Sequence, residues 1–163
     1  MEFKTLRPLF KQSFNFILLA VMSFNTLAND VNLVSGFIRL LPATVPNTAA
    51  YLTLENHGKA KQIIAAETPV AQEAQLHTLI EEKGLIKMRE VTSYALPSHG
   101  QLILEPTGNH IMILGLKKPL LENQQVPLTL IFADQTKLNI SLPVKKGNNN
   151  ADTKHNHHHH HHH

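Results

Sequence analysis

The sequence contains no cysteine, and it has only four methionines among its 163 residues. Without cysteine the fold cannot be held by disulfide bonds, which small exported proteins commonly use. The same absence excludes a thiolate ligand of the blue-copper type and a cysteine nucleophile. Any metal site in this chain must therefore be built from other side chains.

A strong excess of either charge is also missing. Residues 1–28 hold three of the 15 Lys and Arg and one of the 12 Asp and Glu, which leaves 12 basic and 11 acidic residues. This remainder has no basic patch of the kind that binds phosphate backbones, which argues against nucleic acid as a partner. Glu81 and Glu82 fall at an expected hairpin tip, and Ser98 with His99 lacks a third orienting group. We therefore expect a protein that binds rather than an enzyme.

The first 28 residues are typical of an export signal. Three basic residues precede an apolar run over residues 14–24, and Thr26 to Ala28 supplies small residues where signal peptidase cleaves. The apolar run is shorter than the roughly 20 residues that a membrane-spanning helix needs. The sequence predicts cleavage after Ala28 and release into the periplasm of a Gram-negative bacterium. An uncleaved membrane anchor is the alternative.

The rest of the chain up to residue 145 suits a single domain, residues 29–145. Short apolar or alternating runs are separated by turns rich in Pro, Gly and Asn, and no long stretch shows a helical period. The expected strands are 31–41, 49–55, 62–66, 76–80, 85–91, 101–104, 110–116, 127–133 and 137–144. This spacing predicts an all-β fold, an antiparallel Greek-key sandwich or barrel.

Two histidines and two methionines carry the functional signal. Beyond the export signal only two methionines remain, Met88 and Met112, and each accompanies a histidine, His77 or His110. Thioether sulfur and imidazole nitrogen form a soft ligand set that favours Cu(I) over hard ions. The sequence therefore predicts that these four residues bind Cu(I). The alternative is that the methionines fill the core, which is their commonest use.

The expected strand pairing groups these ligands in two pairs. A tight turn centred on Glu82 and Lys83 places His77 directly opposite Met88, where the Cβ atoms are about 4.5–5.5 Å apart. His110 and Met112 are two residues apart in a later strand and point the same way. Each pair is thus expected on a rigid β scaffold.

The C-terminal segment, residues 146–163, differs from the rest in composition. It is almost free of apolar residues, so it is predicted to be disordered. Its imidazoles belong to His155, His157, His158, His159, His160, His161, His162 and His163. As a native tail, this tract is expected to bind Cu(II) or other borderline metals through nitrogen. As a purification tag, it has no such role.

Several stretches together resemble the periplasmic copper chaperone family called PCuAC. They are Gly36-Phe37-Ile38-Arg39, Ala49 to Asn56, Leu76-His77, Met88-Arg89, His110 to Leu116 and Val126 to Leu130. The resemblance implies a cupredoxin-like β-sandwich that carries Cu(I) in the periplasm. It also implies a part in assembling the binuclear copper centre of cytochrome c oxidase, often beside a Sco-type thiol protein.

Two other functions stay open at this point. A metal buffer binds Cu(II) or Zn(II) through the tail and has no delivery target, and a structural secreted β-domain uses the four residues only for packing. The chain also departs from the family pattern, because Pro106-Thr107-Gly108-Asn109 stands where members usually show Pro-Gly-Gly. This departure removes none of the four ligands and bears on how partners are recognised.

Overall fold

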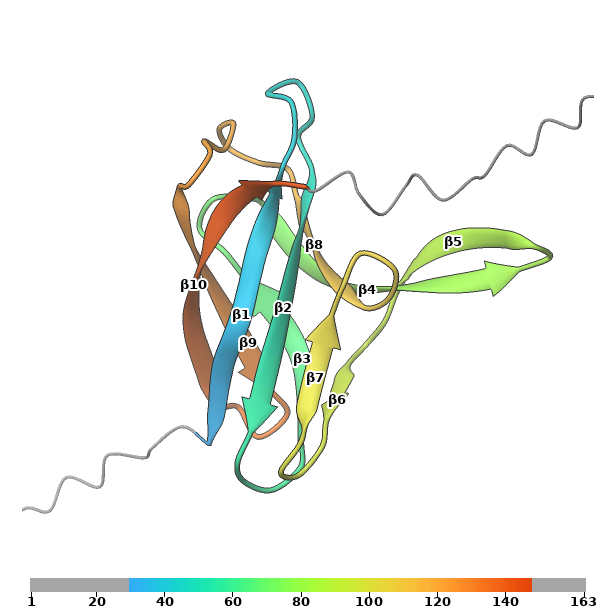
Figure 1. Cartoon of the computed structure of the whole chain (residues 1–163), viewed down its shortest axis with the longest axis vertical. Helices are drawn as coiled ribbons and strands as arrows, with labels where there is room; N and C mark the ends of the chain where they lie inside the picture. Colours follow the sequence, from blue (N-terminus) through green and yellow to red (C-terminus); the bar gives the residue numbers. More distant parts are fainter. Residues whose placement is uncertain (1–29, 148–163) are drawn as a thin grey trace, which may run out of the picture.

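The computed structural model describes residues 30–147, which form ten β-strands and no helix (Figure 1). The strands are β1 (Val31–Leu40), β2 (Thr48–Asn56), β3 (Lys61–Glu67), β4 (Glu73–Glu82), β5 (Leu85–Glu90), β6 (Tyr94–Leu96), β7 (Gln101–Leu104), β8 (His110–Leu114), β9 (Gln125–Phe132) and β10 (Lys137–Lys146). Within this described part there is accordingly no helix able to cross a membrane. The prediction of an all-β fold is confirmed.

Hydrogen bonds join the strands into one sheet that curls back on itself. The order is β5-β4-β8-β2-β1-β10-β9-β3-β6, with β7 attached to β2, and β3 meets β4 where Ala66 pairs with Ala74. In Figure 1, β1 and β2 lie in front of β9 and β3, which gives the two layers of a sandwich. The ladders are antiparallel apart from that between β1 and β10, which is parallel.

Strand β2 shows how the sequence builds the core. It pairs with β1 on one edge and with β8 and β7 on the other, so its backbone groups are satisfied on both sides. Its alternate residues Ala50, Leu52 and Leu54 are buried in the core. Gly36 of β1 pairs with Leu52, and a Cβ at Gly36 would lie only 2.8 Å from Leu52 Cβ and from Leu142 Cδ2. Glycine is thus required where these strands pack closely.

Strand β4 has two parts with different neighbours. Residues 73–77 pair with β8, whereas residues 78–82 pair only with β5. This second part and residues 85–89 of β5 form a two-stranded ribbon that projects from the body of the sandwich (Figure 1). We call these two segments the ribbon.

The turn of the ribbon differs from the predicted one. Lys83 and Gly84 form it, with φ angles of 55° and 75°, and Glu82 pairs with Leu85. Favoured two-residue hairpin turns need positive φ at the central residues, and Gly84 adopts this conformation without strain. The turn expected at Glu82 and Lys83 was therefore wrong by one residue, which shifts every cross-strand pair by two.

Candidate metal centre

Two predicted ligands lie opposite each other in the ladder between β4 and β8. His77 pairs with His110, and Gln75 pairs with Met112 two residues along. Opposed residues and alternate residues point to the same face of a sheet, so these four side chains share one face. The other face of β4 includes Leu76, which is buried in the core. The fold thus gathers three of the four predicted ligands on the outer face of the sheet.

Met88 reaches the same face from the ribbon. It lies opposite Leu79, and Glu90 takes the place opposite His77, so the predicted direct pairing of His77 with Met88 is wrong. Because side chains alternate with a period of two, a shift of two residues leaves Met88 on the face of His77. The two residues are then diagonal neighbours, typically about 7–8 Å apart and within reach of long side chains. The Met88 side chain is 52% exposed.

The His110 imidazole is held in one tautomer. It is only 2% exposed, and its Nδ1 lies 2.9 Å from the carbonyl oxygen of Gly108 in the loop before β8. A carbonyl oxygen only accepts, so Nδ1 carries the proton and donates it. Nε2 then keeps its lone pair, and it is buried with no hydrogen-bond partner among the described residues. Buried polar atoms are rarely left unpaired, so this nitrogen is available to a ligand.

The His77 ring is oriented by a short polar chain on β4. Its Nε2 lies 3.0 Å from Gln75 Oε1, and Gln75 Nε2 lies 3.0 Å from Glu73 Oε2. Because the carboxylate can only accept, the Gln75 amide nitrogen must face Glu73 and its oxygen must face His77. His77 therefore donates from Nε2, which leaves the lone pair on Nδ1. This Nδ1 is also buried without a partner among residues 30–147.

The two free imidazole nitrogens suit a shared metal ion. The His77 and His110 ring centroids are 6.1 Å apart. A metal–nitrogen bond is about 2.0–2.1 Å and a ring centre lies roughly 1 Å farther, so two rings about 6 Å apart can flank one ion. Burial, with a smaller contribution from His110, lowers the pKa of His77 below its usual 6.5, although Glu90 opposes the shift. A lowered pKa keeps the imidazole neutral, as metal binding requires.

Tyr94 joins the two strands that carry the candidate ligands, and the sequence reasoning missed it. It is buried in the short strand β6, and its hydroxyl oxygen lies 2.6 Å from the His77 carbonyl oxygen and 2.7 Å from that of His110. Its single phenolic proton is shared between these two acceptors. Burial raises the pKa of Tyr94 to about 12. The hydroxyl thus ties together the backbones of β4 and β8 where they carry the histidines. The available signal was weak, because β6 has only three residues.

An aromatic side chain borders the centre on the side of β2. Tyr51 is largely buried, with its ring centroid 6.2 Å from that of His110 and 5.3 Å from that of Phe37. The Arg39 guanidinium carbon lies 5.7 Å from the Tyr51 ring centroid. The Tyr51 ring thus covers one side of His110, whereas Met88 on the ribbon is 52% exposed.

The donor set distinguishes this centre from a site for a hard metal. Within residues 30–147 no three His, Cys, Asp or Glu side chains come together as a metal site. The four predicted ligands on this face are two imidazoles and two thioethers, a set that would favour a soft ion. The tail histidines, His155 and 157–163, lie outside the described residues, as does the segment interpreted as an export signal.

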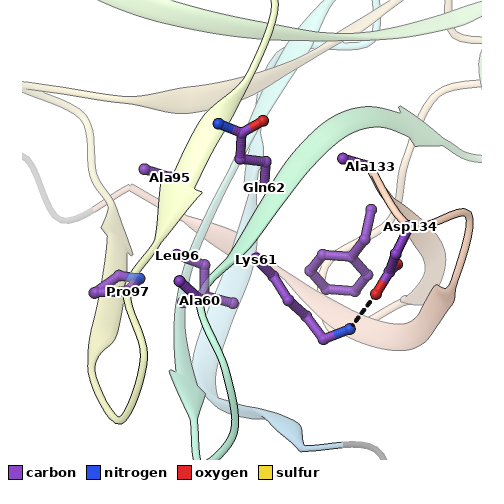
Figure 2. A pocket seen from close by; sticks show the side chains of 9 residues that line it. Ala60, Lys61, Gln62, Ala95, Leu96, Pro97, Ala133 and Asp134 are labelled. Atoms are coloured by element: carbon purple, nitrogen blue, oxygen red, sulfur yellow. Dashed lines mark hydrogen bonds and ion pairs between the residues drawn. The ribbon is translucent and has the colours of Figure 1, made fainter.

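A hollow elsewhere in the molecule has no comparable chemistry. It has a volume of about 440 Å³ and lies between β3, β6 and the turn after β9. Figure 2 shows Lys61 pointing at Asp134 across it, and the two form an ion pair. Hydrogen bonds from Lys61 and then from Thr136 lower the pKa of Asp134 to about 2. The remaining lining is mainly aliphatic, so the hollow offers no free titratable group.

Comparisons with known proteins agree with this geometry. Residues 31–144 match the family described as "Putative lipoprotein LpqE-like". The chain is 36% identical over 100 residues to "Putative lipoprotein Lxx21020" of Leifsonia xyli subsp. xyli, a match that spans 60% of this chain and 60% of that relative. The whole relative is therefore longer than the part that corresponds to this domain.

Solved structures share the fold. The apo PCuAC domain from PmoF1 matches with a TM-score of 0.61 and 18% identity, over 72% of this chain and 95% of that domain. Apo-DR1885 from Deinococcus radiodurans matches with a TM-score of 0.59 and 33% identity, over 74% of this chain and 82% of that protein. The structure of CuI-DR1885 matches with a TM-score of 0.57. The expected resemblance to PCuAC domains, with their cupredoxin-like fold, is confirmed.

Proposed function

Because this chain belongs to the LpqE-like family and shares its fold with PCuAC domains, we propose that it is an exported metallochaperone for Cu(I). His77, Met88, His110 and Met112 are its ligands. DR1885, which is 33% identical to this chain, has also been solved in its Cu(I) form, and this supports the choice of metal. The cargo is a copper ion, and the protein carries out no chemical catalysis.

One observation carries this proposal. Two imidazole nitrogens, His77 Nδ1 and His110 Nε2, are buried and unpartnered on adjacent strands of the described fold, and thioether side chains stand on the same face. A structural role for these histidines gives no reason to leave both nitrogens without a partner. Metal binding gives one, because each nitrogen donates its lone pair to the ion.

The ligand set also accounts for release. All four ligands are neutral, so the bound ion keeps its single positive charge. Thiolates are better donors to soft copper than thioethers or imidazoles, so transfer to a thiolate-bearing acceptor runs downhill. The exposed side chain of Met88 lets an incoming ligand approach before the ion leaves the partly buried His77 and the buried His110.

The finer parts of the proposal concern place and partner. We place the protein in the periplasm after cleavage behind Ala28, and we assign it to delivery of copper for the binuclear copper centre of cytochrome c oxidase, directly or through a Sco-type protein. The His-rich tail, if native, collects Cu(II), whose preference for nitrogen donors it meets.

The second candidate is a periplasmic metal buffer that works through the tail. The seven consecutive histidines at residues 157–163 favour it. The buffer predicts that loss of the tail removes nearly all metal capacity. The chaperone predicts that loss of the tail removes tight Cu(II) binding and leaves one Cu(I) per chain.

Two variants separate these functions. The first ends after Gly147, and the second carries Met88→Leu with Met112→Leu, which keeps the apolar volume and is expected to cost little stability. Titration of both with Cu(I) and Cu(II) should show that the truncated chain keeps Cu(I) and that the double variant keeps only Cu(II). Loss of Cu(I) from the truncated chain, or its retention at unchanged affinity by the double variant, contradicts the four-residue site.

A further inference from the structure

The ribbon has two chemically different faces. Side chains alternate along each strand and opposed residues share a face. The face shared with the copper ligands carries Leu79, Glu81, Ile86 and Met88. We call it the ligand face. The opposite face carries Thr78, Ile80, Glu82, Leu85, Lys87 and Arg89.

The charges on the two faces are arranged differently. On the opposite face Glu82 forms ion pairs with Lys87 at 3.0 Å and with Arg89 at 3.7 Å, so its carboxylate is compensated and one positive charge is left in excess. On the ligand face Glu81 stands on the ribbon and Glu90 at its base, and neither forms an ion pair with another residue of 30–147. The ligand face therefore combines apolar side chains with two uncompensated carboxylates.

The ribbon is also exposed beyond what a monomer needs. Ile86 is 74% exposed and Leu85 is 64% exposed, and β5 is an edge strand that pairs only with β4. Isolated two-stranded hairpins are marginally stable, and apolar edge strands are usually covered or blunted by charge. On the ligand face, Ile86 at 74% exposure neighbours Met88 at 52%, and exposed apolar side chains gathered on one face mark an interaction site.

We propose that the ligand face of the ribbon docks the protein that exchanges copper with this chain, and that this partner surrounds its own copper ligands with apolar side chains and with Lys or Arg. The inference rests on the proposed function. Copper passes by ligand exchange, so the acceptor must touch the ion while Met88 still holds it. Because Met88 lies on the ribbon, such an acceptor lies against Ile86, Glu81 and Glu90. Uncompensated carboxylates select a basic rim.

A second copy of this chain fits the surface less well. Antiparallel pairing of two β5 edges with like faces aligned can set Lys87 against Lys87 or Arg89 of the other copy, and like charges directly opposed are destabilising. Packing of two ligand faces brings four carboxylates, Glu81 and Glu90 of each copy, into one interface with no ion-pair partner on that face. The surface therefore favours a partner of opposite charge.

The charge selection is tested with two synthetic acceptor peptides. Both carry one Cys-x-x-Cys pair between leucines, and they differ only in bearing three lysines or three glutamates. The exported chain, loaded with one equivalent of Cu(I), should transfer copper to the lysine peptide about tenfold faster at low ionic strength, and high salt should remove the difference. Equal rates for the two peptides overturn the proposal.

Matched charge variants locate the selecting groups. Glu81→Gln with Glu90→Gln should abolish the preference for the lysine peptide. Glu55→Gln with Glu67→Gln, on β2 and β3, removes the same charge away from the ribbon and should retain the preference. Equal loss in both pairs means that net charge alone selects the peptide, which contradicts a docking face.

Two neighbouring residues test the apolar part. Ile86→Ser on the ligand face should slow transfer to both peptides about fivefold or more, as expected for a contact worth over about 1 kcal/mol. Leu85→Ser on the opposite face should change the rate less than about twofold. Equal slowing by both variants overturns the assignment of the face. Sedimentation that shows a dimer dissociated by Ile86→Ser also overturns it, since the surface then serves self-association.

Cu(I) affinity measured beforehand on each protein keeps the two hypotheses apart. A wild-type chain that holds no Cu(I) contradicts the proposed function and the docking surface together. A chain that holds Cu(I), with an affinity unchanged by Ile86→Ser and a transfer rate insensitive to every ribbon variant, contradicts the docking surface alone.

Discussion

The strands of the sandwich body and those of the ribbon differ in the number of partner strands and in burial. Strand β2 has partners on both edges, and most of its residues are buried. Strand β5 has one partner, and all six of its residues are exposed. Three proposed ligands belong to the body and one to the ribbon. We infer that the body fixes the positions of the imidazole nitrogens and that copper enters and leaves the proposed site at the ribbon.

The first prediction removes a ligand from the body. His110→Ala should lower Cu(I) affinity more than about 100-fold, because loss of a ligand exceeds the 10–100-fold effect of losing an outer-shell contact. It should also destabilise the fold by about 1–3 kcal/mol, since it leaves the Gly108 carbonyl unpaired. Isothermal titration and urea unfolding measure both effects. His57→Ala, at an exposed histidine, is the control and should change neither. Equal losses of Cu(I) affinity in His110→Ala and His57→Ala contradict the assignment of His110 as a ligand.

The second prediction removes the link between β4 and β8. Tyr94→Phe should destabilise the fold by about 1–3 kcal/mol, because two buried carbonyl oxygens lose their donor. Cu(I) affinity should fall about tenfold as the histidines lose their fixed spacing. Loss of stability in Tyr94→Phe with unchanged Cu(I) affinity would show that the hydroxyl supports the fold and not the spacing of the two histidines.

Alkaline pH gives a signature specific to this hydroxyl. The pKa of Tyr94 is about 12 in the folded protein and about 10 when unfolded. The unfolded chain therefore loses this proton first, so the contribution of Tyr94 is complete below about pH 10 and is lost as pH rises towards about 12. Urea unfolding between about pH 9 and about pH 11.5 should show a decline in the wild type that is smaller in Tyr94→Phe. Parallel declines contradict the assignment.

The third prediction compares the two methionines. Met88→Leu and Met112→Leu should each weaken Cu(I) binding about tenfold and leave Zn(II) binding nearly unchanged, because thioether selects the soft ion. Stability should change by less than about 0.5 kcal/mol for Met88 on the ribbon and by less than about 1.5 kcal/mol for Met112 in the body. Equal losses for both metals mean that these residues are not ligands.

The smallest effect concerns acid. Because the pKa of His77 is lowered by folding, the unfolded chain takes up the proton first as pH falls through about 6.5, and the apo protein loses stability below that value. His77→Asn should flatten this part of the pH profile of unfolding. Copper retention should also fall in mild acid, since imidazole must be neutral to bind. A copper site unchanged down to about pH 4 excludes histidine ligands.

The sequence predicted the body better than the ribbon. Apolar and alternating runs located nine of the ten strands and missed β6, which has three residues. Eight of the nine bury some of their side chains, whereas β5 is exposed throughout and was located by its apolar residues alone. The turn at Lys83 and Gly84 was misplaced by one residue, since Glu82-Lys83 and Lys83-Gly84 differ only in local φ preferences. The face of Met88 survived this error because the resulting shift is even.

The candidate site was also predicted only in part. Residue types, the expected strand pairs and the family resemblance together suggested the four ligands. The fold brings His77 beside His110, which no spacing could specify, since that contact joins strands far apart in the chain. The free nitrogens, their orientation by Gln75 and Gly108, and the role of Tyr94 depend on side-chain geometry. None of these has a local sequence signal.

X-ray absorption at the copper edge tests the central claim most directly. The sample is residues 29–163, with His155 and the histidines at 157–163 replaced by asparagine and one equivalent of Cu(I) bound. The account predicts a single Cu(I) with two sulfur and two nitrogen neighbours. A copper shell of nitrogen and oxygen alone, or a chain that binds no stoichiometric Cu(I), contradicts it.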